Sequence, residues 1–290
     1  MSNRPHPDSN PSSTPVPPRT ATKSAATSSD VLRQVVVLLG SAVAIVGAFI
    51  GSGATGGESQ PEIGDGARAA DATLVAPGQP AFSIWSVIYT GLVAYAIWQA
   101  LPAQRADPRQ RRVGWLVLVS MVLNAVWIGV VQAGLLTLSV PVIVALLATL
   151  VVVVLRLQRT PADGTVETVV LDGTMGLYLG WVSVATIANV AAVLTSAGLT
   201  RPLGLAPEVW SVAVLAVAAA VGLLLARYAG ARWTIAVALA WGLAWIAIAR
   251  WSGEPQSTPT AVAAATAAVV VLLGPLLLRG SAAGRTPRAG

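Results

Sequence analysis

The sequence predicts an all-α protein, a polytopic transmembrane bundle of about eight helices. Two features of its composition support this fold class. Hydrophobic residues make up 55% of the 290 residues, and the mean hydropathy is +0.71. Charged residues make up only 10%, whereas a soluble domain carries about 25%. This is too little charge to cover a water-facing surface. We therefore expect most of the protein surface to face the lipid bilayer.

Eight apolar segments follow one another along the chain, each near the roughly 20 residues that a spanning helix needs. They cover about residues 33–51, 82–101, 113–134, 138–156, 171–196, 209–227, 231–250 and 260–278. A tail rich in Pro, Ser and Thr, residues 1–30, precedes them and is expected to be disordered. A second tail, residues 280–290, follows.

The basic residues give this arrangement an orientation. With the N-terminus inside, 15 of the 18 Lys and Arg residues fall in the tails and in the inner loops. Only Arg68, Arg201 and Arg250 fall outside. Basic residues concentrate on the cytoplasmic side of membrane proteins. The sequence therefore predicts a bacterial-type cytoplasmic (inner) membrane protein with both termini cytoplasmic. The same bias accounts for the net charge of +6 without nucleic acid as a partner.

The residue types present exclude several kinds of chemistry. The chain has no cysteine, and its single histidine, His6, lies in the N-terminal tail. Thiolate metal sites, cysteine nucleophiles and a histidine ligand for haem are therefore not expected. Asp172 and Glu208 lie at predicted helix starts, where an acid is favoured by the helix dipole. We therefore expect no enzyme, no metal site and no tightly held cofactor. The Gly-rich acidic loop 52–81 is either a lid over a site or a solvated linker.

Three predicted helices carry aromatic and amide residues at helical spacing, so that each set shares one face. The first set contains Trp85 and Tyr89, the second Asn124 and Trp127, and the third Tyr178, Trp181, Ala185 and Asn189. An amide in hydrocarbon needs a partner, so both asparagines should face other helices. The three faces either line a shared pocket for a flat, mostly apolar ligand or simply pack the bundle.

The segment 33–51 carries a stripe of small residues instead, Gly40, Ala44, Gly47 and Gly51. Their spacings of four, three and four place them on one face of a helix. Small residues allow the backbones of neighbouring helices to approach closely. We therefore expect this helix to pack tightly against another helix or a second protomer.

The aromatic and amide motifs resemble those of the tryptophan-rich sensory protein family, TspO, which includes the translocator protein. Residues 80–100 read PAFSIWSVIYTGLVAYAIWQA and are similar to the family's F-G-P-V-W-T-x-L-Y motif. Residues 123–129, LNAVWIG, are similar to L-N-x-x-W-S. Residues 177–194, LYLGWVSVATIANVAAVL, are similar to P-Y-L-x-W-x-x-F-A-x-x-L-N. The order of the motifs also agrees, but the family's W-x-P-P after its first helix is absent.

The resemblance implies a five-helix membrane domain over residues 31–197, including the loop 52–81, followed by three additional helices over 198–279. It implies a cavity for a porphyrin or another apolar small molecule, bound non-covalently, and a homodimer. The ligand-binding residues that it implies are the motif residues of the three helices: Trp85, Tyr89, Asn124, Trp127, Tyr178, Trp181, Ala185 and Asn189. A sensor or regulator is the favoured function. A small-molecule transporter and a structural membrane protein without a ligand are the alternatives.

Overall fold

The computed structural model describes residues 25–51, 73–201, 204–228 and 233–283, and within these ranges the chain is helical with short connections. The tail 1–24, residues 52–72 of the acidic loop and residues 284–290 lie outside the described residues, so the lid prediction can be followed only over residues 73–81. Eight described helices are long and apolar enough to cross a membrane, which confirms the predicted fold class. They are α1 (Ser28–Gly51), α2 (Ile84–Ala100), α3 (Pro108–Gln132), α4 (Leu136–Gln158), α6 (Thr174–Ser196), α7 (Pro207–Tyr228), α8 (Trp233–Ser252) and α9 (Thr258–Ala283).

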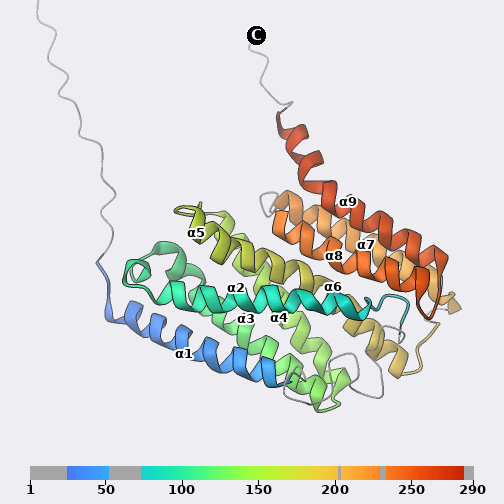
Figure 1. The fold of residues 1–290 in the computed structure, drawn as a ribbon, viewed down its shortest axis with the longest axis horizontal. Coiled ribbons are helices and arrows are strands. Elements are labelled where there is room, and N and C mark those ends of the chain that lie inside the picture. Colours follow the sequence, from blue (N-terminus) through green and yellow to red (C-terminus); the bar gives the residue numbers. More distant parts are fainter. Residues whose placement is uncertain (1–24, 52–72, 202–203, 229–232, 284–290) are drawn as a thin grey trace, which may run out of the picture.

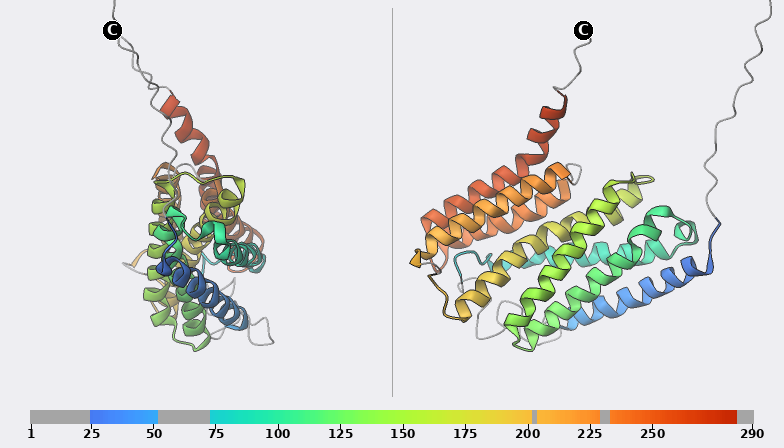
Figure 2. Two further views of the ribbon diagram at one scale, coloured as in Figure 1. Left: turned by 90° about the vertical axis from the view of Figure 1, so that its left-hand side faces the viewer. Right: turned by 180° about the vertical axis from the view of Figure 1, so that it is seen from behind.

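The helices form two groups that share one seam (Figure 1). Helices α1, α2, α3, α4 and α6 surround one hydrophobic core, and α7, α8 and α9 surround a second, smaller one. Helix α8 packs along α6 and joins the groups, while α7 packs mainly on α9 (Figure 2). The long axes of the helices run roughly side by side, as parallel spans of one membrane require.

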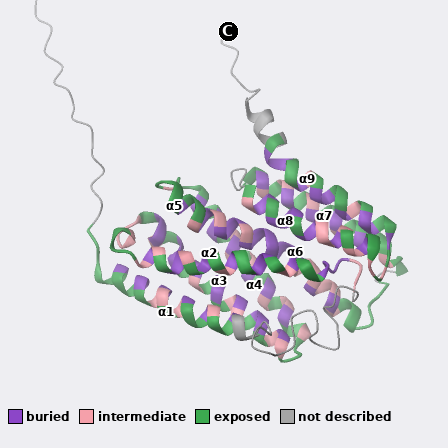
Figure 3. Cartoon of the chain, viewed as in Figure 1, coloured by how far each residue is buried: buried purple, intermediate pink, exposed green. Residues whose placement is uncertain are grey.

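Side chains on the outer faces of the bundle are exposed and apolar, as a lipid-facing surface requires (Figure 3). On α1, for example, Val43 is 74% exposed and Leu39 is 61% exposed. In water such a surface would be an aggregation hazard, but lipid tails cover it without cost. Burial therefore supports the membrane location independently of helix length.

Glycine allows the closest helix contacts in the bundle. A Cβ atom on Gly180 of α6 would lie 2.5 Å from the carbonyl oxygen of Ile235 in α8. A Cβ atom on Gly242 of α8 would lie 2.7 Å from a methyl group of Val184 in α6. The seam between the two groups is therefore tight because small residues let the backbones approach. Gly40 of α1 plays the same part against Leu118 of α3, as the small-residue stripe predicts.

Buried ion pairs join the helices at the end of the bundle where α1 begins, which we call the Arg-rich end. Arg109 of α3 contacts Glu167 at 2.8 Å and Asp172 at 2.6 Å. The two acids lie on α5 (Thr165–Glu167) and on the π-helical turn Thr168–Gly173 that leads into α6. Asp172 lies directly before the start of α6, as predicted, but it also pairs with Arg109. It is one of two carboxylates that compensate a buried guanidinium. Glu208 lies in the first turn of α7, as predicted.

Candidate functional site

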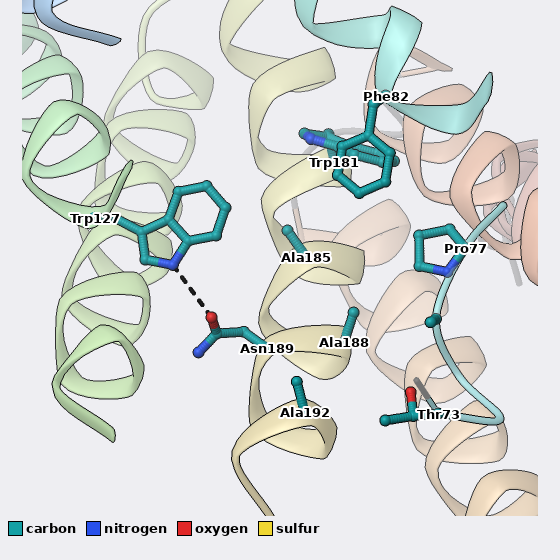
Figure 4. A pocket seen from close by; sticks show the side chains of 10 residues that line it. Thr73, Pro77, Phe82, Trp127, Trp181, Ala185, Ala188, Asn189 and Ala192 are labelled. Carbon is teal, nitrogen blue, oxygen red and sulfur yellow. Dashed lines mark hydrogen bonds between the residues drawn. The ribbon is translucent and has the colours of Figure 1, made fainter. Parts of the chain in front are cut away.

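A small cavity lies between α3, α6 and the segment that precedes α2, at the end of the bundle opposite the Arg-rich end (Figure 4). Its volume is about 40 Å³. Aromatic rings and small side chains make up most of its wall. The lining residues are Thr73, Ala76, Pro77, Phe82, Trp127, Trp181, Ala185, Ala188, Asn189 and Ala192. A space of this size holds a few water molecules but no drug-sized ligand.

Half of the sequence-predicted site residues line this cavity. Trp127 comes from α3, and Trp181, Ala185 and Asn189 come from α6. The spacing of four residues from Trp181 to Ala185 and on to Asn189 places all three on one helical face. Figure 4 shows this face of α6 turned toward Trp127 on one side and toward Pro77 on the other.

The other predicted residues form the layer directly behind the cavity. The ring of Trp85 contacts that of Trp181 edge to face, with ring centroids 6.2 Å apart. It also stacks on Tyr89 at 5.2 Å and meets Tyr178 at 6.0 Å. Phe82, which does line the cavity, contacts the other side of the cluster with its ring centroid 5.6 Å from that of Trp181. Such ring pairs contribute beyond their buried area and hold the cavity wall in one geometry.

Asn189 connects three helices at the cavity. Its Oδ1 accepts a hydrogen bond from Nε1 of Trp127 at 3.4 Å and another from Oγ of Ser139 in α4 at 3.0 Å. Asn124 makes a comparable link outside the cavity, where its Nδ2 donates to the hydroxyl of Tyr89 at 3.0 Å. The prediction that both asparagines face other helices is confirmed, but only Asn189 lines the cavity.

Two buried hydrogen-bond donors of the cavity residues have no acceptor in the part of the chain that the structure describes. They are Nε1 of Trp181 and Nδ2 of Asn189, on side chains whose residues are 1% and 2% exposed. A buried polar group without a partner costs about 1–3 kcal/mol. A ligand acceptor that reached either donor would recover part of this cost.

The segment that closes the cavity is held in place by α8. Nε1 of Trp241 donates to the carbonyl oxygen of Ala81 at 3.0 Å, and the amide of Gly78 donates to the carbonyl oxygen of Trp245 at 3.3 Å. The 3-10 helix Gln79–Ser83 then carries Phe82 to the cavity. The second group of helices therefore contributes to the site, although it supplies no residue of the cavity wall.

Helical spacing did not identify the residues of this closing segment, although they belong to the loop 52–81 that the sequence offered as either a lid or a linker. Thr73, Ala76 and Pro77 belong to a non-helical stretch, so no helical spacing marks them. Phe82 lies within the first aromatic motif, residues 80–100, and was identifiable only through the resemblance of that motif to the family's F-G-P-V-W sequence. The contact of this segment with α8 joins residues about 160 positions apart.

Comparison with known proteins gives one match. The sequence model of the TSPO-like protein family matches residues 34–277. The matched region includes all three aromatic motifs. It also includes most of the segment 198–279, for which the resemblance in these motifs indicated no counterpart in the family. No curated protein and no solved structure matches the chain.

Proposed function

The chain belongs to the TSPO-like family, and from this premise we propose that it binds a hydrophobic small molecule, such as a porphyrin, in the cavity between α3 and α6. In this proposal the protein acts as a sensor or regulator in the membrane. The observation that carries the proposal is the pair of unpaired buried donors, on Trp181 and Asn189, within a wall of aromatic rings.

The chemistry of the wall specifies the class of ligand. Indole and phenyl rings offer flat apolar contact, and the two free N–H groups require acceptors on the ligand. A porphyrin has a flat apolar body, and its carboxylate oxygens are acceptors. The residues that line the cavity carry no ionisable side chain. The site therefore suits recognition better than acid–base catalysis, and we propose that the protein is not an enzyme.

A ligand of this size enters only if one wall of the cavity moves. Helices α3 and α6 lie in the main core, whereas residues 73–78 have no regular secondary structure before the 3-10 helix. The stretch with the fewest backbone hydrogen bonds opens at the lowest cost. We propose that this segment swings away from Trp181 when the ligand binds, and that the change in its contact with α8 carries the signal.

The distribution of Arg residues sets the orientation in this proposal. The Arg-rich end contains the start of α1, the connections α2–α3 and α4–α6, the end of α7 and the start of α8. By the positive-inside rule it faces the cytoplasm of a bacterial-type inner membrane. The cavity then lies toward the outer leaflet and takes its ligand from the outer side or from the membrane.

A fluorescence titration tests the proposal. Protoporphyrin added to the purified protein in detergent should quench tryptophan fluorescence saturably, because Trp127 and Trp181 line the site. Ala185→Phe fills the cavity, and it should raise the porphyrin concentration needed for half-maximal quenching by at least about tenfold. Ala148→Phe makes the same change on the exposed face of α4 and should leave the titration unchanged. Non-saturable quenching, or equal behaviour of the two variants, would contradict the proposal.

A further inference from the structure

A second, larger cavity lies between the two groups of helices, away from the aromatic site. Its volume is about 330 Å³, and it is bounded by α4, α6, α7 and α8. Leu147 and Val151 of α4, Ile187 of α6, Val217 of α7 and Leu239 of α8 are among the residues that form its wall. An apolar cavity of about 150 Å³ already stays free of water and takes up apolar molecules. This space is therefore unsuited to water.

The two hydroxyl groups on the α6 side of this cavity do not make it polar. Oγ of Ser183 donates to the carbonyl oxygen of Leu179 at 2.8 Å, and Oγ1 of Thr186 donates to that of Val182 at 2.7 Å. Both hydroxyls are thus satisfied within their own helix. The cavity consequently presents hydrocarbon to any occupant.

The cavity continues toward the end of the bundle opposite the Arg-rich end, where polar side chains join its mostly apolar wall. A second space of about 530 Å³ shares Trp210 and Val214 of α7 with the first. Its wall includes the hydroxyl residues Thr195 and Thr200 and the carboxylate of Glu208. An apolar channel with a polar, acidic mouth has the polarity profile of a membrane lipid.

We propose that one phospholipid with an ammonium headgroup, such as phosphatidylethanolamine, occupies this groove between α6 and α7. One acyl chain fills the apolar part, and the headgroup lies at the mouth, where its ammonium group faces Glu208 and its phosphate faces the threonine hydroxyls. Helix α7 packs mainly on α9 and contacts α6 only slightly, so a lipid in the groove would add to the contact between α6 and α7.

The contacts of this bound lipid differ from those of an ordinary lipid in the shell around the protein. Side chains from four helices surround the apolar part, so a chain within it loses contact with bulk lipid on most sides. A chain seated there must leave contacts with four helices before it can exchange, so it should exchange more slowly than lipid of the shell. The apolar part of the groove shares no lining residue with the aromatic cavity, whereas the mouth shares Thr73 with it.

Lipid retention by the full-length protein tests the inference. After extensive washing in detergent, bound phospholipid is counted by native mass spectrometry and by phosphorus analysis. The wild type should keep one phosphatidylethanolamine per chain. Ala213→Phe places a ring in the groove and should reduce retention at least about tenfold. The control is Ala216→Phe, on an exposed position of the same helix that faces away from the groove, and it should retain the lipid.

Adding lipid back identifies the headgroup. Phosphatidylethanolamine should rebind more tightly than phosphatidylglycerol, and Glu208→Gln should reduce this preference by about two- to fivefold without abolishing acyl-chain binding. Thermal unfolding provides a second readout, in which added lipid should stabilise the wild type and Ala216→Phe but not Ala213→Phe. Loss of all lipid from the washed wild type, or equal retention by both phenylalanine variants, would overturn the inference. A preference for phosphatidylglycerol would overturn the proposed headgroup.

Discussion

Asn124 and Asn189 form a matched pair that separates ligand binding from helix packing. Both are buried amides that bond to a neighbouring helix, at 1% and 2% exposure. Only Asn189 lines the cavity and holds a free donor next to it. Replacing each by leucine keeps the approximate volume and removes the hydrogen bonds. The two variants therefore differ mainly in whether the lost amide could donate a hydrogen bond to a ligand in the cavity.

The magnitudes follow from the bonds that each variant loses. In Asn189→Leu, Trp127 and Ser139 both lose an acceptor. At about 0.5–1.5 kcal/mol for each bond, the free energy of unfolding should fall by roughly 1–3 kcal/mol. In Asn124→Leu one bond is lost, so the fall should be about 0.5–1.5 kcal/mol. Loss of one bond to the ligand should weaken porphyrin affinity about two- to tenfold in Asn189→Leu alone.

Two measurements on the same samples decide the matter. Unfolding of detergent-solubilised protein, followed by circular dichroism, gives the stability of each variant. Protoporphyrin quenching of tryptophan fluorescence gives the affinity, and in Asn124→Leu it should stay within about twofold of the wild type. If both variants weaken binding equally, or if both lose stability without any effect on binding, then the amides act through packing and the ligand reasoning is refuted.

Three further predictions concern the contacts around the cavity and the helix seam. Trp241→Phe removes the N–H that the carbonyl oxygen of Ala81 accepts, so the closing segment should open more readily and quenching titrations should show porphyrin affinity raised about two- to tenfold. Arg109→Gln leaves two buried carboxylates without their cation and should cost about 3–5 kcal/mol of stability, measured by denaturant unfolding. Gly180→Val forces a side chain against the backbone of Ile235; it should lower the thermal midpoint by separating α6 from α8, at a cost of about 1–3 kcal/mol. Unchanged porphyrin affinity in Trp241→Phe would contradict the role of its hydrogen bond. Unchanged stability in Arg109→Gln or Gly180→Val would contradict the role of the ion pairs or of the close helix approach.

The number and order of the helices were predictable because they depend on local properties. Each apolar segment has to reach across the hydrocarbon core, and the Arg residues mark which ends lie together. The segment 171–196 shows the limit of this approach. Its start lies within a π-helical turn, and Asp172 there points to Arg109, which is 63 positions away. Charge counting assigned Arg109 to a loop, since a sequence does not show which charges become buried together.

The candidate site was predictable where its residues share one helix. Trp181, Ala185 and Asn189 follow helical spacing, and they line the cavity as a set. Trp85 and Tyr89 satisfy the same spacing but lie one layer behind, because the rotation of α2 within the bundle depends on its contacts with α6 and the π-turn. Spacing fixes which residues share a face, whereas packing fixes what that face meets.

The sequence by itself determined a membrane bundle of eight spans and three aromatic helical faces, and it predicted an orientation for the bundle. These features follow from local hydropathy, charge and periodicity, which act over one or two helical turns. Only the tertiary structure decided that Phe82 and Pro77 close the cavity and that Trp241 holds them there. It also decided that α7 stands away from α6 and leaves a groove of lipid-like polarity. Such features depend on how helices distant in the sequence pack, because small residues at one seam and large ones at another set the distances between them.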